Sequence, residues 1–193
     1  MKTYGEERSF LESCGVRVVE LSDESGRARV CLVPAWQGRV MTSTAAGTGG
    51  PGYGWINRSL IASGVRKSRF NPFGGEERLW LGPEGGPFSL YFAPGAEQVY
   101  ANWQVPVALD TEPFRVVGRD ARQVRFEAEM SLRNAAGTRF EIGVARRVGL
   151  LSHRQAEVSL GRVLPPELAL VAYRSENRIG NCGPEPWTPA GGA

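Results

Sequence analysis

The feature that most constrains the fold is a strict alternation of apolar and polar side chains along residues 124–132. Apolar residues occupy the even positions and polar residues the odd positions between them. Residues 134–137 read Asn-Ala-Ala-Gly, which favours a turn, and the alternation resumes along residues 139–144. Successive side chains of a β-strand point to opposite faces of a sheet. The pattern therefore predicts an antiparallel hairpin with one buried face and one solvated face.

Shorter segments elsewhere also predict strands separated by turns. The 25 glycines and 13 prolines are spread along the chain, as suits a protein with many turns. Residues 4–13 predict a short helix, the helical pattern of residues 152–160 is too short to predict one, and residues 41–71 predict a long surface loop. We therefore expect an all-β fold, an antiparallel β-sandwich in a single domain over residues 1–193. The further strand candidates are residues 16–20, 28–32, 88–92, 99–107, 114–117 and 168–173.

Charge and hydropathy argue against two classes of partner. The chain has 23 basic and 20 acidic residues, and its arginines alternate with acids instead of forming a basic stripe. We therefore expect no nucleic-acid partner. No apolar run approaches the roughly 20 residues that span a bilayer, so we expect no membrane partner. Residues 1–11 are rich in charge and do not read as a secretory signal.

Cysteine, histidine and glycine patterns argue against metals and nucleotide cofactors. The three cysteines, Cys14, Cys31 and Cys182, have no paired spacing, which argues against a disulfide framework and a zinc site. A reducing cytoplasm is the simplest location. One histidine, His153, offers neither a catalytic triad nor a transition-metal site. The glycine-rich residues 46–54 lack the Gly-Lys-Ser/Thr ending of a phosphate loop. We expect no metal and no cofactor.

The segment Gly74–Gly86 is the strongest candidate for a functional motif. It places Glu76, Glu77, Arg78, Trp80 and Glu84 between two glycine pairs. Carboxylates accept hydrogen bonds from hydroxyls, a guanidinium donates, and an indole face covers C–H groups, so this set suits a polyhydroxylated ring. The alternative interpretation is a solvated turn with Trp80 in the core, in which Arg78 pairs with Glu84 and does nothing else.

Similar polar and aromatic clusters recur at residues 36–39, 54–58 and 174–181. Each places amide or guanidinium donors beside an aromatic residue or a glycine. For Trp36 and Trp55 a place in the core is the alternative, and for Asn57 the alternative is a turn cap. If the clusters converge in space, the candidate binding residues are Arg39, Asn57, Arg58, Glu76, Glu77, Arg78, Trp80, Glu84, Trp103, Arg174 and Asn177.

These motifs resemble an uncharacterised bacterial family within the galactose mutarotase-like superfamily. The residues that carry the resemblance are Pro34–Ser43, Gly54–Arg58, Gly74–Gly86 and Asn177–Gly183. The resemblance implies a large antiparallel β-sandwich whose concave face receives a sugar, as in aldose epimerases and the sugar-binding domains of larger enzymes. Mutarotases use a histidine as acid and a late glutamate as base, whereas residues 177–183 contain no histidine.

The same resemblance carries an expectation about the end of the chain. Domains of this superfamily continue well beyond the position of Ala193, so the chain resembles the N-terminal portion of a longer domain. Such a portion has uncovered sheet edges and apolar faces. We therefore expect a homodimer that forms through those edges.

Three functional hypotheses follow from the sequence. The leading one is a protein that recognises a small-molecule carbohydrate, with Trp80 or Trp103 stacking on the sugar and the charged residues holding its hydroxyls. The second is an aldose 1-epimerase-like or other sugar-processing enzyme, with a glutamate and an arginine in place of the histidine pair. The third is a structural module without a ligand, in which buried ion pairs tie the loops together.

Overall fold

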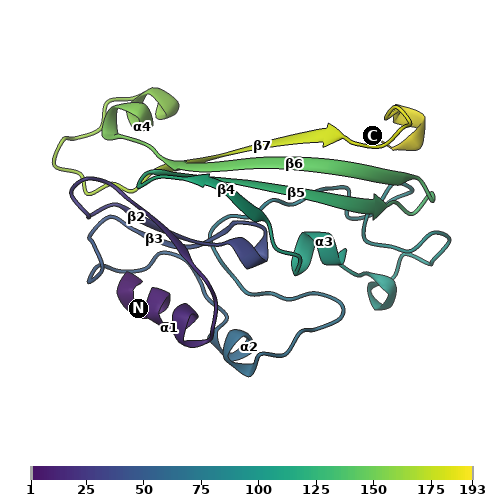
Figure 1. Cartoon of the computed structure of the whole chain (residues 1–193), viewed down its shortest axis with the longest axis horizontal. Helices are drawn as coiled ribbons and strands as arrows, with labels where there is room; N and C mark the ends of the chain where they lie inside the picture. The colour runs from purple at the N-terminus through teal and green to yellow at the C-terminus, as the bar shows by residue number, and fades with distance from the viewer. Residues whose placement is uncertain (1, 193) are drawn as a thin grey trace.

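The computed structural model describes residues 2–192 and consists mainly of two antiparallel sheets (Figure 1). The small sheet has the strand order β1-β2-β3 and the large sheet has the order β4-β5-β6-β7. The strands are β1 (Val19–Ser22), β2 (Arg29–Val33), β3 (Arg39–Thr44), β4 (Arg115–Arg119), β5 (Gln123–Arg133), β6 (Arg139–Leu150) and β7 (Tyr173–Asn181). The helices are α1 (Tyr4–Ser13), α2 (Arg58–Ser63), α3 (Val107–Asp110) and α4 (His153–Leu160), with 3-10 turns at Pro34–Trp36, Tyr100–Asn102 and Pro189–Gly191.

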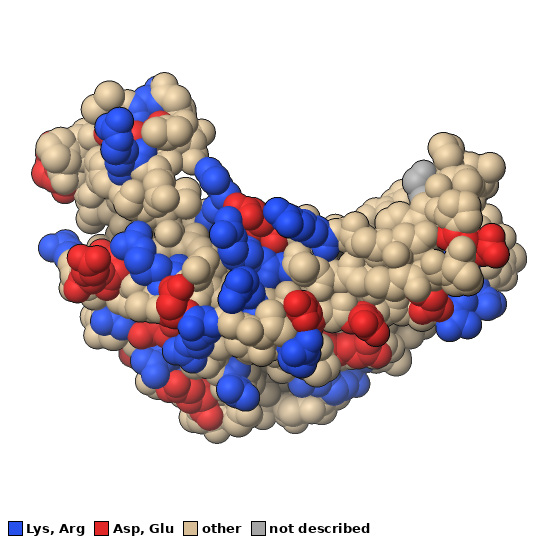
Figure 2. Space-filling view, turned by 45° about the horizontal axis from the view of Figure 1, so that its top comes forward, with Lys and Arg blue, Asp and Glu red and all other residues tan. Residues whose placement is uncertain are grey.

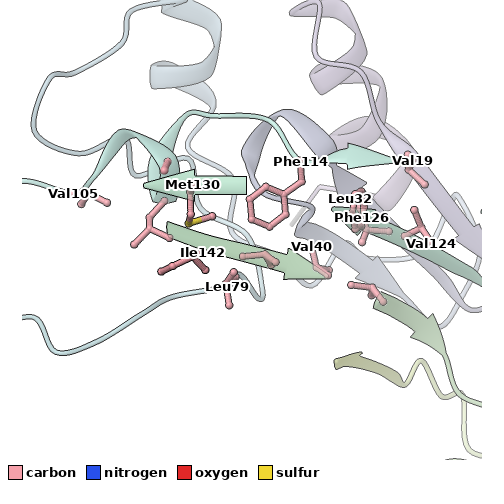
Figure 3. Packing of buried hydrophobic residues seen from close by; sticks show 14 of the residues in the cluster. Val19, Leu32, Val40, Leu79, Val105, Phe114, Val124, Phe126, Met130 and Ile142 are labelled. Atoms are coloured by element: carbon pink, nitrogen blue, oxygen red, sulfur yellow. The ribbon is translucent and has the colours of Figure 1, made fainter. Parts of the chain in front are cut away.

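The two sheets pack face to face around the main hydrophobic core. Figure 3 shows side chains of both sheets meeting there, with Leu32 and Val40 from the small sheet and Phe126 and Ile142 from the large one. The predicted hairpin is confirmed as β5 and β6, which pair from Gln123↔Gly149 to Arg133↔Arg139. The even-numbered residues of both strands face the core and the odd-numbered ones face solvent. The expected antiparallel β-sandwich is thus confirmed at the level of fold class.

A second hydrophobic cluster lies on the other face of the small sheet. It joins Cys31 and Met41 to Tyr4 and Leu11 of α1, which covers that face (Figure 1). The helix predicted over residues 4–13 is confirmed as α1, and it begins with a capping box at Thr3. The chain therefore forms three layers, with the outer face of the large sheet left open. No helix among residues 2–192 is long and apolar enough to cross a membrane.

Several predicted elements differ from those observed. Residues 88–92 and 99–107 are irregular, apart from the 3-10 turn and the start of α3, because side chains satisfy their backbone groups. Ser89 Oγ, for example, accepts from the Tyr91 amide at 3.1 Å and donates to the Glu84 carbonyl at 2.9 Å. Their apolar side chains still enter the core, where Tyr91 and Val105 are buried.

Other differences concern element boundaries and exposure. Residues 41–44 belong to the buried strand β3 rather than to a surface loop. The strand predicted at 168–173 lies instead at 173–181, as β7. Helix α4 forms because Ser152 and Gln155 make a capping box. Trp36 is buried as one alternative expected, but Trp55 is 63% exposed, so the core interpretation of Trp55 is wrong.

Candidate functional site

A single arginine on the inner face of the large sheet organises the candidate site. Arg146 occupies an inward position of β6, and its side chain is 0% exposed. Its guanidinium forms a bidentate ion pair with Glu77 and donates to Asn177 Oδ1 at 2.8 Å. It also donates to the Gly38 carbonyl at 3.4 Å. The sequence clusters around residues 38, 77 and 177 therefore converge on one buried cation.

The neighbouring carboxylate of Glu76 has its own set of donors. It accepts from the Ser43 amide at 2.6 Å, from the Ser43 hydroxyl at 2.9 Å and from the Tyr173 hydroxyl at 3.1 Å. Glu77 accepts in addition from the Ser175 hydroxyl at 3.1 Å. We call this group the Arg146 cluster; it comprises Ser43, Glu76, Glu77, Arg146, Tyr173, Ser175 and Asn177.

The glycine pair before the two glutamates fixes their position against β3. The Val40 amide donates to the Glu77 carbonyl at 3.0 Å, and the Glu76 amide donates to the Val40 carbonyl at 2.8 Å. Gly75 has φ +106°, and a Cβ there would lie 2.6 Å from the Val40 carbonyl oxygen. Only glycine combines this left-handed backbone with so close an approach. The glycine pair of the motif is therefore what allows the carboxylates to reach the sheet.

The Arg146 cluster is accessible at one side. Asn177 is exposed, and its amide nitrogen donates no hydrogen bond to any residue within 2–192. Two large aromatic residues, Trp55 and Tyr53, are 63% and 52% exposed. The Gly75 amide donates to the Trp55 carbonyl at 2.7 Å, and the indole lies against Gly74. The exposed indole therefore contacts a glycine that precedes Glu76 by two residues in the chain.

The phenol of Tyr173 holds its proton more tightly than a free tyrosine. Burial raises the pKa of Tyr173, and the neighbouring Glu76 carboxylate raises it further. The phenol therefore remains a hydrogen-bond donor to Glu76 at neutral pH. This bond holds the carboxylate in place from the β7 side while Ser43 holds it from β3.

A second group of predicted site residues lies apart from the Arg146 cluster. Arg78 donates to the Leu109 carbonyl, and its guanidinium lies 4.3 Å from the ring centroid of Trp80. Trp80 Nε1 donates to Glu84 at 2.7 Å, so the bonded partner of Glu84 is the tryptophan and not Arg78. Trp103 stacks between Tyr91 and Tyr100. Other side chains of the protein thus already pack against the ring faces of Trp80 and Trp103.

The remaining predicted residues have local partners. Asn57 caps α2 by accepting from the Leu60 amide at 3.3 Å, and Arg58 pairs with Glu7 at 2.6 Å. Arg39 is 2% exposed and donates to the Gly74 carbonyl at 2.9 Å. Burial lowers the pKa of Arg39 to about 9, which leaves it charged at pH 7. Arg174 lies on the outer face of β7 and donates to Ser159 Oγ at 2.9 Å.

Comparison with known proteins places the chain in a family. A family model described as a family of unknown function, DUF6786, matches residues 2–193. The chain belongs to the DUF6786 family. No curated protein matches it, and no solved structure matches it either.

Several members of the Arg146 cluster were not identified as site residues from the sequence. Ser43 and Ser175 lie in segments that the sequence singled out but were not chosen as site residues, and Tyr173 lies just before the cluster at residues 174–181. Arg146 does have a signal, because the apolar alternation of residues 140–150 places an arginine at a core-facing position. A charge at such a position must find partners in the interior. Extending the phase of the alternation to residue 150 would have identified it.

Proposed function

We propose that this protein recognises a carbohydrate at the Arg146 cluster. The observations that carry the proposal are two ordered carboxylates, the exposed amide of Asn177 and the exposed indole of Trp55, which lies against Gly74 at the start of the same segment. Aromatic faces pack against the C–H groups of sugar rings, while carboxylates and amides bond the hydroxyls. The resemblance to the galactose mutarotase-like superfamily supports the same class of ligand.

The hydrogen-bonding capacity of the cluster fits this role. A carboxylate has about four acceptor positions. Glu76 uses three of them, for the Ser43 amide, the Ser43 hydroxyl and Tyr173. Glu77 uses three as well, for the bidentate Arg146 and for Ser175. Each glutamate can therefore accept one hydroxyl of a ligand, and the free Asn177 amide nitrogen can donate to another.

A thermal-shift and calorimetric screen of monosaccharides and uronic acids tests the proposal. We expect one sugar to stabilise the native chain, with binding weakened about tenfold in Trp55→Ala and in Asn177→Ala, a change of about 1.4 kcal/mol. Tyr100→Ala, which removes another exposed aromatic residue, is the matched control and should bind normally. Anomer exchange of any bound reducing sugar, measured by polarimetry, then tests the sugar-processing alternative.

The buried ion pair favours one other candidate, a structural role without a ligand. Arg146 is fully buried, so its pairing with Glu77 ties the 74–86 segment to the large sheet whether or not a sugar binds. Under this alternative no sugar shifts the melting temperature of the native chain. Loss of the shift in Asn177→Ala, which leaves the ion pair in place, supports recognition instead.

A further inference from the structure

Two arginines and one aspartate form a polar group in the interior that shares no residue with the Arg146 cluster. On the surface, basic and acidic side chains are intermingled and reach solvent (Figure 2). Arg39 and Asp110, by contrast, are only 2% and 4% exposed. Arg78 is half-buried, and its Nε is inaccessible to solvent. We call these three residues the Arg39 group.

Hydrogen bonds to one loop segment and to α3 bring the group together. Arg39 donates to the Gly74 carbonyl at 2.9 Å. Three residues earlier in the same segment, Asn71 donates to Asp110 Oδ2 from its backbone amide at 2.9 Å and from its side chain at 2.7 Å. Arg78 donates to the backbone carbonyl of the residue directly before Asp110 in α3. This segment and α3 therefore hold both arginines near the one aspartate.

The Arg39 group has more hydrogen-bond donors than acceptors. Nε and Nη2 of Arg39 and Nε of Arg78 are buried and have no acceptor among residues 2–192. Within that range the one unpartnered acceptor of the group is Asp110 Oδ1. Aromatic rings lie over the guanidinium groups, Phe73 at 5.7 Å from Arg39 and Trp80 at 4.3 Å from Arg78. Such rings attract the cation but do not replace acceptors for the N–H groups, which point outward in the guanidinium plane.

The charge of the group is unbalanced in the same direction. Two guanidinium groups stand against a single carboxylate, which leaves one excess positive charge in a place without water. Burial and the nearby Arg78 guanidinium lower the pKa of Arg39 to about 9, and burial lowers the pKa of Arg78 to about 10. Both arginines are still charged at pH 7. Buried charges in proteins are normally paired, because an unpaired one is costly.

We infer that the Arg39 group binds a small monovalent anion, such as chloride, at the free N–H groups of its two arginines. One negative charge balances the excess, whereas buried water would satisfy the donors and leave the charge. A phosphate, with nearly two charges at neutral pH, would overcompensate it. The 2% exposure of Arg39 excludes a large organic anion. Sugar binding at the Arg146 cluster is not required, because the two sites share no residue.

Melting temperatures of the native chain in sodium chloride and in sodium sulfate, compared at equal ionic strength, test this site in solution. An ion that binds only the folded state stabilises it, so we expect melting about 2–4 °C higher in chloride than in sulfate. Non-specific salt effects act in the opposite direction, because sulfate strengthens apolar burial. Crystals of the native chain grown in sodium bromide should show an anomalous peak beside the Arg39 and Arg78 N–H groups.

A pair of matched variants locates the effect. Arg39→Gln removes the excess charge and keeps an amide donor, so we expect it to lose the advantage of chloride over sulfate. Arg178→Gln makes the same change at an exposed arginine of β7 and should keep the full advantage.

Two results would overturn the anion site. One is a native chain that melts no higher in chloride than in sulfate, or an advantage of chloride that Arg39→Gln retains in full. The other is a bromide crystal with water alone at these N–H groups. The crystal uses the native chain, so it decides the question even if Arg39→Gln fails to fold.

Discussion

At the scale of single residues, the structure depends most on Arg146. An arginine on the core-facing side of a strand must be neutralised, because an unpaired buried charge is very costly. Glu77 supplies the counter-charge, and Asn177 Oδ1 and the Gly38 carbonyl accept further hydrogen bonds from two other parts of the chain. The same contacts hold the Glu77 carboxylate in one orientation.

We predict that Glu77→Ala lowers the free energy of unfolding by about 3 kcal/mol, because it leaves the Arg146 guanidinium buried without its counter-charge. Urea unfolding measured at pH 7 checks this. Glu129→Ala removes an exposed glutamate without an ion-pair partner among the described residues and should change stability by less than about 0.5 kcal/mol. Equal effects of the two substitutions would contradict the role assigned to the ion pair.

At the scale of elements, the glycines of the motif and of β7 have opposite roles. Gly75 is constrained by its positive φ and by the Val40 carbonyl, whereas Gly180 is constrained by no neighbour. We predict that Gly75→Ala destabilises the fold by about 1–3 kcal/mol. Gly180→Ala should instead leave stability unchanged or raise it by about 0.5 kcal/mol, because alanine orders the strand more easily.

Melting curves of these two variants, followed by circular dichroism, provide the measurement. Each variant serves as the control for the other, since the chemical change is identical. A Gly75→Ala protein as stable as the native chain would mean that the 74–77 segment can retreat from β3 without loss. The carboxylates of the Arg146 cluster would then have no fixed position.

The sequence predicted best those strands that have one face in the core and the other face in solvent. β5 and β6 alternate along nearly their full length because one face meets the core and the other meets water. β7 was predicted too early, at residues 168–173, because its inner face carries Tyr173, Ser175 and Asn177 and therefore lacks an apolar period. Residues 88–105 have apolar side chains in the core but no ladder partners, and sequence pattern does not separate that case from a strand.

The candidate site was predictable to a similar degree. Glu76, Glu77 and Asn177 were identified because their motifs combine polar and aromatic residues, and the structure brings them together around Arg146. Arg58 and Asn57 belong to similar motifs but serve local contacts. Composition of a short segment does not tell whether its polar groups face a neighbouring loop or a shared centre. Their role in binding stays a prediction, as does the dimer expected through uncovered sheet edges.

At the scale of the whole molecule, buried phenols make the free energy of unfolding depend on pH in the alkaline range. Burial is the main cause that raises the pKa of Tyr4, Tyr91 and Tyr173 above the ordinary value of 10.0. Each phenol donates in the folded state, to Glu20, to the Leu81 carbonyl and to Glu76 respectively. The folded protein thus holds protons that the unfolded chain releases above about pH 10.

We predict that the free energy of unfolding is constant with respect to these groups below about pH 10 and falls as the pH rises further. Urea unfolding at intervals between neutral pH and about pH 11 measures the slope. Tyr4→Phe should make the fall shallower, whereas Tyr53→Phe, which alters a half-exposed phenol, should leave it unchanged. A pH dependence in Tyr4→Phe identical to that of the native chain would contradict the assignment.

The molecule as a whole combines a rigid sandwich with polar groups left open on two faces. We propose that the polar cluster around Arg146 recognises a sugar through Trp55 and Asn177. The most direct measurement is a calorimetric titration of the best sugar from the screen into the native chain and into Asn177→Ala, both checked for equal stability. We predict about tenfold weaker binding in the variant. Identical affinity in two equally stable proteins would contradict it.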